Sequence, residues 1–166
     1  GTEGVVTPLT QQTVEDFKQV INTNVTGVWL AMKHSAPVMQ NRGGGSIIAI
    51  SSIGGVIGFP QIAPYIASKH AVYGLVKTAC LELAEGGIRV NAIGPGPIAN
   101  RMMDSLGGQL NPQDPNAVRE MVNEMVPMKR YGTNEEVANL ALFLGSDEAS
   151  YCNGAMYLID GGFTAA

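Results

Sequence analysis

The sequence predicts an α/β fold with a parallel β-sheet, and the order of its elements is the main reason. Three short apolar runs, at residues 46–50, 88–93 and 155–159, have the composition of strands that are buried inside a sheet. Helical patterns precede and separate these runs, and strand–helix–strand crossovers of this kind are right-handed and join parallel strands. Each run ends in a polar or glycine-rich segment, and ligands bind beyond the carboxyl ends of the strands in such sheets.

Residues 13–40 carry the first helical pattern. Thr13 provides an N-cap, and apolar side chains then recur at helical spacing. Residues 22–27 interrupt the pattern with poor helix formers. We therefore expect a kink or an irregular turn near Asn24 and a bend at Pro37.

A long helix is predicted for residues 64–85, between a proline at its first turn and the glycines that stop it. One face of this helix carries only small residues, namely Ala67, Ala71, Gly74 and Thr78. Such a face indicates a very close neighbour, for which a helix of a second subunit is the natural candidate. We therefore expect a homo-oligomer, either a dimer or a tetramer.

Residues 97–131 are expected to be less regular, apart from a helix that Asp114 caps and that runs to about Met125. This segment is rich in methionine, which suits a mobile lid over an apolar substrate or, equally, ordinary helix packing. Residues 133–136 then form a capping box that opens a helix over residues 135–144.

Composition narrows the function classes. With 166 residues, 45% hydrophobic and 14% charged, the chain fits one globular domain over residues 1–166. The net charge is −4 and basic residues are scattered, so we expect no nucleic-acid partner, and no apolar run is long enough to predict a membrane span. Cys80, Cys152, His34 and His70 lack metal-ligand spacing, so no metal is predicted. Reduced, buried cysteines favour a cytoplasmic protein.

The strongest chemical signal is the pair Tyr65 and Lys69. Residues four apart lie on one face of a helix, so the ammonium group is expected beside the phenol. A neighbouring cation favours the phenolate and lowers the pKa of the tyrosine, which makes it a usable general acid/base near neutral pH. Ser52 ends the preceding strand, so it is expected at the same edge of the sheet.

Five segments with this chemistry occur in a familiar order, and together they resemble the short-chain dehydrogenase/reductase family. The segments are Asn24-Val25-Thr26-Gly27, Ile50-Ser51-Ser52, Tyr65-Ile66-Ala67-Ser68-Lys69, Asn91-Ala92-Ile93-Gly94-Pro95-Gly96 and Asp160-Gly161-Gly162. The resemblance implies hydride transfer between NAD or NADP and a small alcohol or carbonyl substrate. It implies that the cofactor is bound by Gly1, Tyr65, Lys69, Pro95, Gly96, Ile98 and Asn100.

The resemblance also implies the catalytic roles. Tyr65 would exchange a proton with the substrate oxygen, and Lys69 would lower the pKa of Tyr65 and hold the nicotinamide ribose. Ser52 would stabilise charge on the substrate oxygen, and Asn24 would hold a water that connects Lys69 to solvent. Asn100 stands where the family often has a threonine, so its contact with the nicotinamide carboxamide is the least secure of these roles.

The chain also departs from the family pattern. The glycine-rich turn of the family is absent, and Gly1 resembles the last residue of its Asn-Asn-Ala-Gly segment. We therefore expect the C-terminal two-thirds of a Rossmann-like doubly wound parallel sheet that lacks the N-terminal strands, with the edge of its first strand exposed. Two alternatives stay open: a 3-oxoacyl-thioester (acyl carrier protein) reductase, with Arg101, Lys129 and Arg130 as candidate carrier contacts, and a non-catalytic fragment or oligomerisation module.

Overall fold

The computed structural model describes residues 1–165 and contains a sheet of three parallel strands. β1 (Gly45–Ile50), β2 (Ile88–Pro95) and β3 (Met156–Ile159) lie in the order β1-β2-β3. Ile47 of β1 pairs with Val90 of β2 in this register. The predicted α/β fold with a parallel sheet is confirmed.

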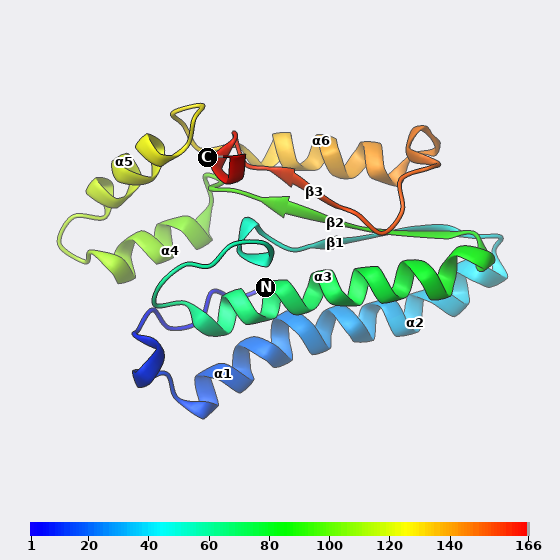
Figure 1. The fold of residues 1–166 in the computed structure, drawn as a ribbon, viewed down its shortest axis with the longest axis horizontal. Helices are drawn as coiled ribbons and strands as arrows, with labels where there is room; N and C mark the ends of the chain where they lie inside the picture. The colour runs from blue at the N-terminus through cyan, green and yellow to red at the C-terminus, as the bar shows by residue number, and fades with distance from the viewer. Residues whose placement is uncertain (166) are drawn as a thin grey trace.

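Helices cover both faces of the sheet (Figure 1). One layer contains α1 (Val14–Ile21), α2 (Gly27–Asn41) and α3 (Ala63–Leu83), and α6 (Asn134–Gly145) lies on the opposite face. The strands point toward α4 (Arg101–Leu110) and α5 (Pro115–Met125), which lie at the carboxyl end of the sheet (Figure 1). Short 3₁₀ turns occur at Leu9–Gln11, Ile53–Gly55, Ala84–Gly86, Asp147–Ala149 and Phe163–Ala165.

A π-helical turn joins α1 to α2 over Asn22–Thr26, which confirms the irregular turn predicted near Asn24. Thr13 caps α1 as expected, because its hydroxyl accepts a hydrogen bond from the amide of Asp16 at 3.1 Å. Pro37 lies inside α2, which continues to Asn41.

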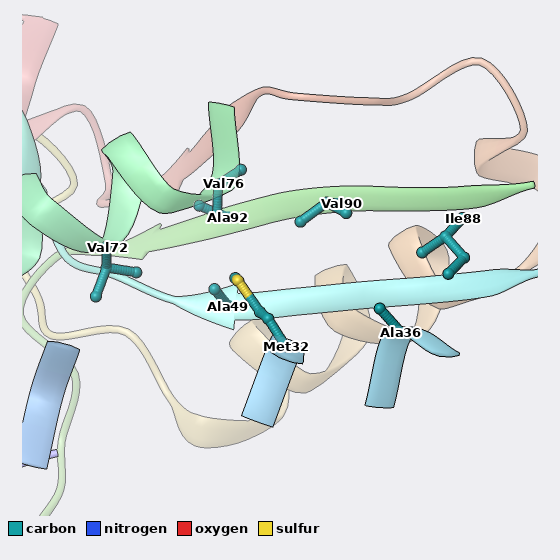
Figure 2. Close-up of a cluster of buried hydrophobic side chains, with 8 residues drawn as sticks. All are labelled: Met32, Ala36, Ala49, Val72, Val76, Ile88, Val90 and Ala92. Atoms are coloured by element: carbon teal, nitrogen blue, oxygen red, sulfur yellow. The ribbon is translucent and has the colours of Figure 1, made fainter. Parts of the chain in front are cut away.

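A single apolar cluster fixes α2 and α3 on the sheet. Figure 2 shows its side chains, which reach from both helices onto β1 and β2: Met32, Ala36, Ala49, Val72, Val76, Ile88, Val90 and Ala92. A second cluster, of Ile93, Leu144 and Ala149, packs α6 on the other face. Burial of such side chains contributes about 25 cal/mol per Å² of apolar surface. The first cluster therefore holds the middle of α3, at Val72 and Val76, against the sheet.

The segment between β2 and α6 is more regular than the sequence suggested. Asn100 caps α4, because its side-chain oxygen accepts hydrogen bonds from the amides of Met102 at 3.0 Å and Met103 at 3.3 Å. Gly107 and Gly108 weaken the helical pattern of this segment, which is why α4 was not predicted. The helix after Asp114 and the capping box at Thr133 agree with expectation.

The outer edge of β1 is free among residues 1–165, as expected. β1 pairs with β2 on one side, and a cavity of about 290 Å³ runs along its other side. The cavity is lined by Ile47–Ile50 of β1, by residues of the π-turn and α2, and by Gly1 and Lys69. An edge of this kind presents unpaired backbone groups to any further strand.

Candidate active site

Tyr65 and Lys69 lie on the first turns of α3, at the carboxyl end of the sheet. Pro64 occupies the start of this helix, where its missing N–H group is not needed. The Lys69 ammonium nitrogen lies 5.5 Å from the centre of the Tyr65 ring, so the two side chains share a face as the spacing predicted. Lys69 is only 6% exposed.

Ser52 follows β1 and faces the same space as Tyr65. A Cβ built on Gly54 would lie 3.4 Å from Tyr65 Cε1 and 3.5 Å from Ser52 Oγ. The phenol ring and the Ser52 hydroxyl therefore both lie next to the same position. The hydroxyl of Ser52 also accepts a hydrogen bond from the amide of Gly54 at 3.0 Å, which fixes its position. Ser51 ties this strand end to α3, because its hydroxyl donates to the carbonyl of Lys69 at 2.9 Å.

Asn24 sits in the π-turn, and both the oxygen and the nitrogen of its side chain make hydrogen bonds. Its oxygen accepts from the amide of Thr2, and its nitrogen donates to the carbonyl of Thr2, both at 2.8 Å. The same nitrogen donates to the Ser68 hydroxyl at 3.1 Å. Because an amide has two N–H donors, the side chain has no donor left for a water. Within residues 1–165 the side-chain oxygen accepts only one hydrogen bond, so it keeps a second acceptor position for the predicted water.

Gly1 lies between Asn24 and Lys69. A Cβ at this position would come within 2.8 Å of Asn24 Oδ1 and 3.6 Å of the Lys69 nitrogen. The close approach accounts for a glycine here. The structure thus brings together four of the predicted residues, Asn24, Ser52, Tyr65 and Lys69, with Gly1 beside them.

Burial dominates the electrostatics of the site. It lowers the pKa of Lys69 to about 8, and the ammonium group donates to the carbonyl of Ile50 at 3.0 Å. Burial also raises the pKa of Tyr65, while the hydrogen bond with Ser52 lowers it and the negative charge of Glu3 raises it further. The sequence predicted a lowered pKa for Tyr65. The structure differs because desolvation outweighs the favourable contacts and Lys69 is turned onto a backbone carbonyl.

Pro95 and Gly96 lie where β2 ends, as predicted for the cofactor side of the site. The amide of Gly96 donates to the carbonyl of Ile159 at 2.9 Å. A Cβ at Gly96 would lie 2.7 Å from the Cα of Asp160, so only glycine allows the two strand ends to approach this closely. Asp160 is held in turn by Thr164, whose hydroxyl donates to its carboxylate at 2.6 Å.

Ile98 and Asn100 continue this segment toward α4. Ile98 is 5% exposed and forms an isolated bridge with Gly132. The Asn100 oxygen is committed to capping α4, so the amide nitrogen is the group that remains for the predicted contact with a carboxamide. Both residues are therefore fixed in place by the chain itself.

Glu3 is a functional candidate that sequence reasoning missed. It is only 6% exposed, and its charge acts on Tyr65. The guanidinium of Arg101 donates to its two carboxylate oxygens at 3.2 and 3.4 Å. An acidic residue in a segment otherwise made of glycine, threonine and valine was the only local signal, and its partner is 98 residues away in the chain.

Within residues 1–165 no group of three or more His, Cys, Asp and Glu side chains is placed to hold a metal ion. In the same part of the chain, no helix combines the length and the apolar character that a membrane span requires.

Comparison with known proteins decides the family. A family model described as enoyl-(acyl carrier protein) reductase matches residues 2–164. Levodione reductase of Leifsonia aquatica is 37% identical over 166 residues. The chain belongs to the short-chain dehydrogenase/reductase family. Cyclohexanol dehydrogenase of Acinetobacter sp. (strain SE19) is 36% identical over 165 residues, and a 3-oxoacyl-(acyl-carrier-protein) reductase of Thermotoga maritima is 42% identical over 148 residues.

Solved structures of this family have the same fold. The crystal structure of levodione reductase superposes with a TM-score of 0.98, covering 100% of this chain and 64% of that one. A gluconate 5-dehydrogenase from Burkholderia cenocepacia J2315, in complex with NADP and tartrate, is 30% identical and has a TM-score of 0.91, covering 100% of this chain and 63% of that one. The chain aligns with 62% of the length of levodione reductase, 61% of cyclohexanol dehydrogenase and 57% of the Thermotoga maritima reductase. These alignments include 100%, 99% and 89% of this chain, respectively.

Proposed function

We propose that the chain carries the proton-transfer half of an NAD- or NADP-dependent oxidoreductase that interconverts small alcohols and carbonyl compounds. The observation that carries this proposal is the arrangement of Ser52 and Tyr65 around one point, with the buried Lys69 ammonium behind the phenol. The names of levodione reductase and cyclohexanol dehydrogenase support the same class of substrate.

In this proposal Tyr65 is the general acid/base. An alcohol must lose its hydroxyl proton as its hydride leaves, and the phenolate form of Tyr65 accepts that proton. Ser52 donates a hydrogen bond to the substrate oxygen and stabilises the charge that develops on it. The Lys69 cation offsets the charge of the phenolate, and Asn24 holds a water that connects Lys69 to solvent.

The residues present fit a nicotinamide cofactor. An ammonium group has three N–H donors and that of Lys69 gives one to the carbonyl of Ile50, so further donors suit the hydroxyls of a ribose. Gly1, Pro95, Gly96, Ile98 and Asn100 would line the nicotinamide side. The cofactor supplies the acceptor or donor of the hydride, and both NAD and NADP are compatible with these residues.

Acyl-carrier-protein reduction is the second candidate, since a relative of that name matches. The three basic residues that would meet an acidic carrier are each paired within the chain. Arg101 contacts Glu3, Lys129 contacts Glu124 at 3.1 Å, and Arg130 contacts Glu136 at 2.6 Å. These internal pairs reduce the positive charge available to a carrier protein, so we favour a free alcohol or ketone.

We further propose a single domain, a homo-oligomer and a cytoplasmic location. Ala67, Gly74 and Thr78 of α3 are exposed, and a Cβ at Gly74 would meet no atom within 4 Å, so this face is open to a second subunit. Both cysteines are free, which suits a reducing compartment. The competing hypothesis, a non-catalytic oligomerisation module, needs the same open face but not the Ser52–Tyr65 arrangement.

Replacement of Tyr65 by Phe in the full-length protein tests the function. We expect kcat for cyclohexanol oxidation to fall by a factor of about 10³, because the group that accepts the proton is lost while the ring still fills its site. Turnover is followed by nicotinamide absorbance, and circular dichroism confirms the fold.

The matched control is Tyr73→Phe, on the same helix, which should leave turnover unchanged. A Tyr65→Phe enzyme with turnover near that of the parent would exclude Tyr65 as the acid/base. A panel of 3-oxoacyl thioesters, with and without carrier protein, separates the two substrate classes, and absence of turnover on both would favour the non-catalytic module.

A further inference from the structure

A chain of hydrogen bonds links the π-turn to the first turns of α3. Ser68 lies between Tyr65 and Lys69 in the sequence of α3 and is fully buried. Its hydroxyl donates to the carbonyl of Tyr65 at 2.7 Å and accepts from the side-chain nitrogen of Asn24 at 3.1 Å. Asn24 is bonded in turn to the backbone of Thr2. Ser68 therefore connects Asn24 to the helix that carries the proposed acid/base.

The direction of these hydrogen bonds is fixed, because a carbonyl oxygen can only accept. The one hydroxyl proton of Ser68 points at the carbonyl of Tyr65, so the Ser68 oxygen is left as an acceptor. An acceptor requires the NH₂ end of the Asn24 amide, and the oxygen of that amide then faces away from Ser68. The backbone of Thr2 imposes the same orientation, because its amide donates to the Asn24 oxygen and its carbonyl accepts from the Asn24 nitrogen.

This orientation matters because of what the Asn24 oxygen faces. A Cβ built on Gly1 would lie 2.8 Å from Asn24 Oδ1 and 3.6 Å from Lys69 Nζ, so the oxygen and the ammonium nitrogen lie next to the same position. An amide oxygen there can accept from the ammonium group or from a water bound to it, whereas an NH₂ group would place one donor against another. Ser68 therefore acts on Lys69 through Asn24.

We propose that Ser68 is a positioning residue: its hydroxyl holds the Asn24 amide with the oxygen turned toward Lys69 and fixes the π-turn against the start of α3. This inference rests on the proposed function of Tyr65 and Lys69. The hydroxyl of Ser68 is bonded to groups of the chain itself. Loss of this hydroxyl should therefore change kcat and leave the KM for the alcohol near that of the parent.

Replacement of Ser68 by Ala in the full-length protein tests the effect on turnover. We expect kcat for cyclohexanol oxidation to fall about tenfold, because a buried N–H group of Asn24 loses its acceptor. Ser68→Cys keeps a weaker donor and acceptor, so its kcat should lie between those of the parent and of Ser68→Ala. Ser35→Ala is the matched control and should leave kcat unchanged. Ser35 also donates to the carbonyl three residues earlier in its helix, that of Met32, at 3.4 Å.

A double-mutant cycle with Asn24→Ala shows whether Ser68 acts through Asn24. If it does, Ser68→Ala costs little once the Asn24 amide is gone, so the double variant should have the kcat of Asn24→Ala alone. Independent effects would instead make the double variant about tenfold slower than Asn24→Ala. The urea midpoints of the four proteins give the same cycle without turnover. There the loss in the double variant should be smaller than the sum of the two single losses.

The outcomes distinguish this inference from the proposed function. If the parent shows no turnover, the proposed function fails, and additive losses of urea midpoint would still overturn the pairing of Ser68 with Asn24. With an active parent, the inference is wrong if Ser68→Ala keeps the parent kcat. It is also wrong if the losses of kcat multiply in the double variant, because Ser68 would then act independently of Asn24.

Discussion

At the scale of single residues, burial of the Lys69 ammonium group lowers the stability of the folded protein. Its pKa is lowered to about 8 because a cation is buried at the end of the sheet. The unfolded chain binds this proton up to a pKa of 10.5, so the folded state loses it first as the pH rises. The free-energy cost of the buried charge is therefore full below about pH 8 and is relieved between pH 8 and 10.5.

Lys69→Met should make the protein more stable and less active. A pKa shift of this size corresponds to about 3 kcal/mol, and loss of the hydrogen bond to Ile50 offsets about 1 kcal/mol of that gain. We expect urea denaturation at pH 7 to show a gain of about 2 kcal/mol, vanishing by about pH 10, together with loss of turnover. Lys77→Met, an exposed lysine on the same helix, is the control. A loss of stability in Lys69→Met would contradict this account.

The residues of the site were predictable to the extent that their signal is local. Tyr65 and Lys69 are four apart on a helix, and Ser52 ends a strand, so spacing alone placed them at one edge. The raised pKa of Tyr65 was not predictable, because it depends on burial and on Glu3, which the sequence separates from Tyr65 by α1, the π-turn, α2 and β1. Local patterns carry no information about such distant neighbours.

At the scale of elements, two glycine turns hold the far end of the sheet together. The loop after α2 and the loop after α3 touch through backbone atoms, and Gly45 starts β1 by donating to the carbonyl of Gly87 at 3.1 Å. Gly44 has φ of +119°, and a Cβ there would collide with that same carbonyl oxygen. Gly43 has φ of +93° and open space around it.

Alanine substitutions at Gly43 and Gly44 separate the free-energy cost of backbone strain from the cost of a steric collision. Gly43→Ala should cost about 1 kcal/mol of unfolding free energy, because only the left-handed backbone is strained. Gly44→Ala should cost about 3 kcal/mol or more, since the strand start must also move away from Gly87. Chemical denaturation of both variants provides the measurement. Equal losses would show that the two loops do not pack as closely as described.

The elements themselves were mostly predictable, for reasons that differ between them. The strands were visible as isolated apolar runs, and the capping box at Thr133 marked the start of α6. The helix α4 was not predictable, because Gly107 and Gly108 lower its helix propensity. Asn100, which caps it, was interpreted as a cofactor contact instead. Its contacts with α5 and with the loop before α1 stabilise a helix that its own sequence supports only weakly.

At the scale of the whole molecule, the family fold is confirmed, and the chain presents one open helix face and one free strand edge. The cap residues and apolar runs predicted a parallel sheet, but not how its outer surfaces are covered. Trp29 and Leu30 of α2 are 44% and 39% exposed. Apolar exposure of this kind is typical of an interface between subunits.

Gly74→Arg should therefore dissociate the proposed homo-oligomer. The new side chain would project from the open face of α3, where it would meet no atom of its own subunit but would obstruct a second helix. Light scattering coupled to size-exclusion chromatography should show the mass falling to that of a monomer, with circular dichroism unchanged. Gly58→Arg, in open space outside the helices, is the control. An unchanged mass would show that the subunit interface does not involve this face of α3.

The π-turn at Asn22–Thr26 also sets how far α2 is rotated about its own axis relative to α1. Val20, Asn24, Met32 and Ala36 are all buried, although they follow one another at multiples of four residues. In a regular α-helix each step of four overshoots a full turn by about 40°, so from Val20 to Ala36 the overshoot would approach half a revolution. The wider turn removes part of that excess. Removing one residue from it would rotate all of α2 by about 100° and point its apolar row away from the sheet, so this segment should tolerate changes of side chain better than changes of length.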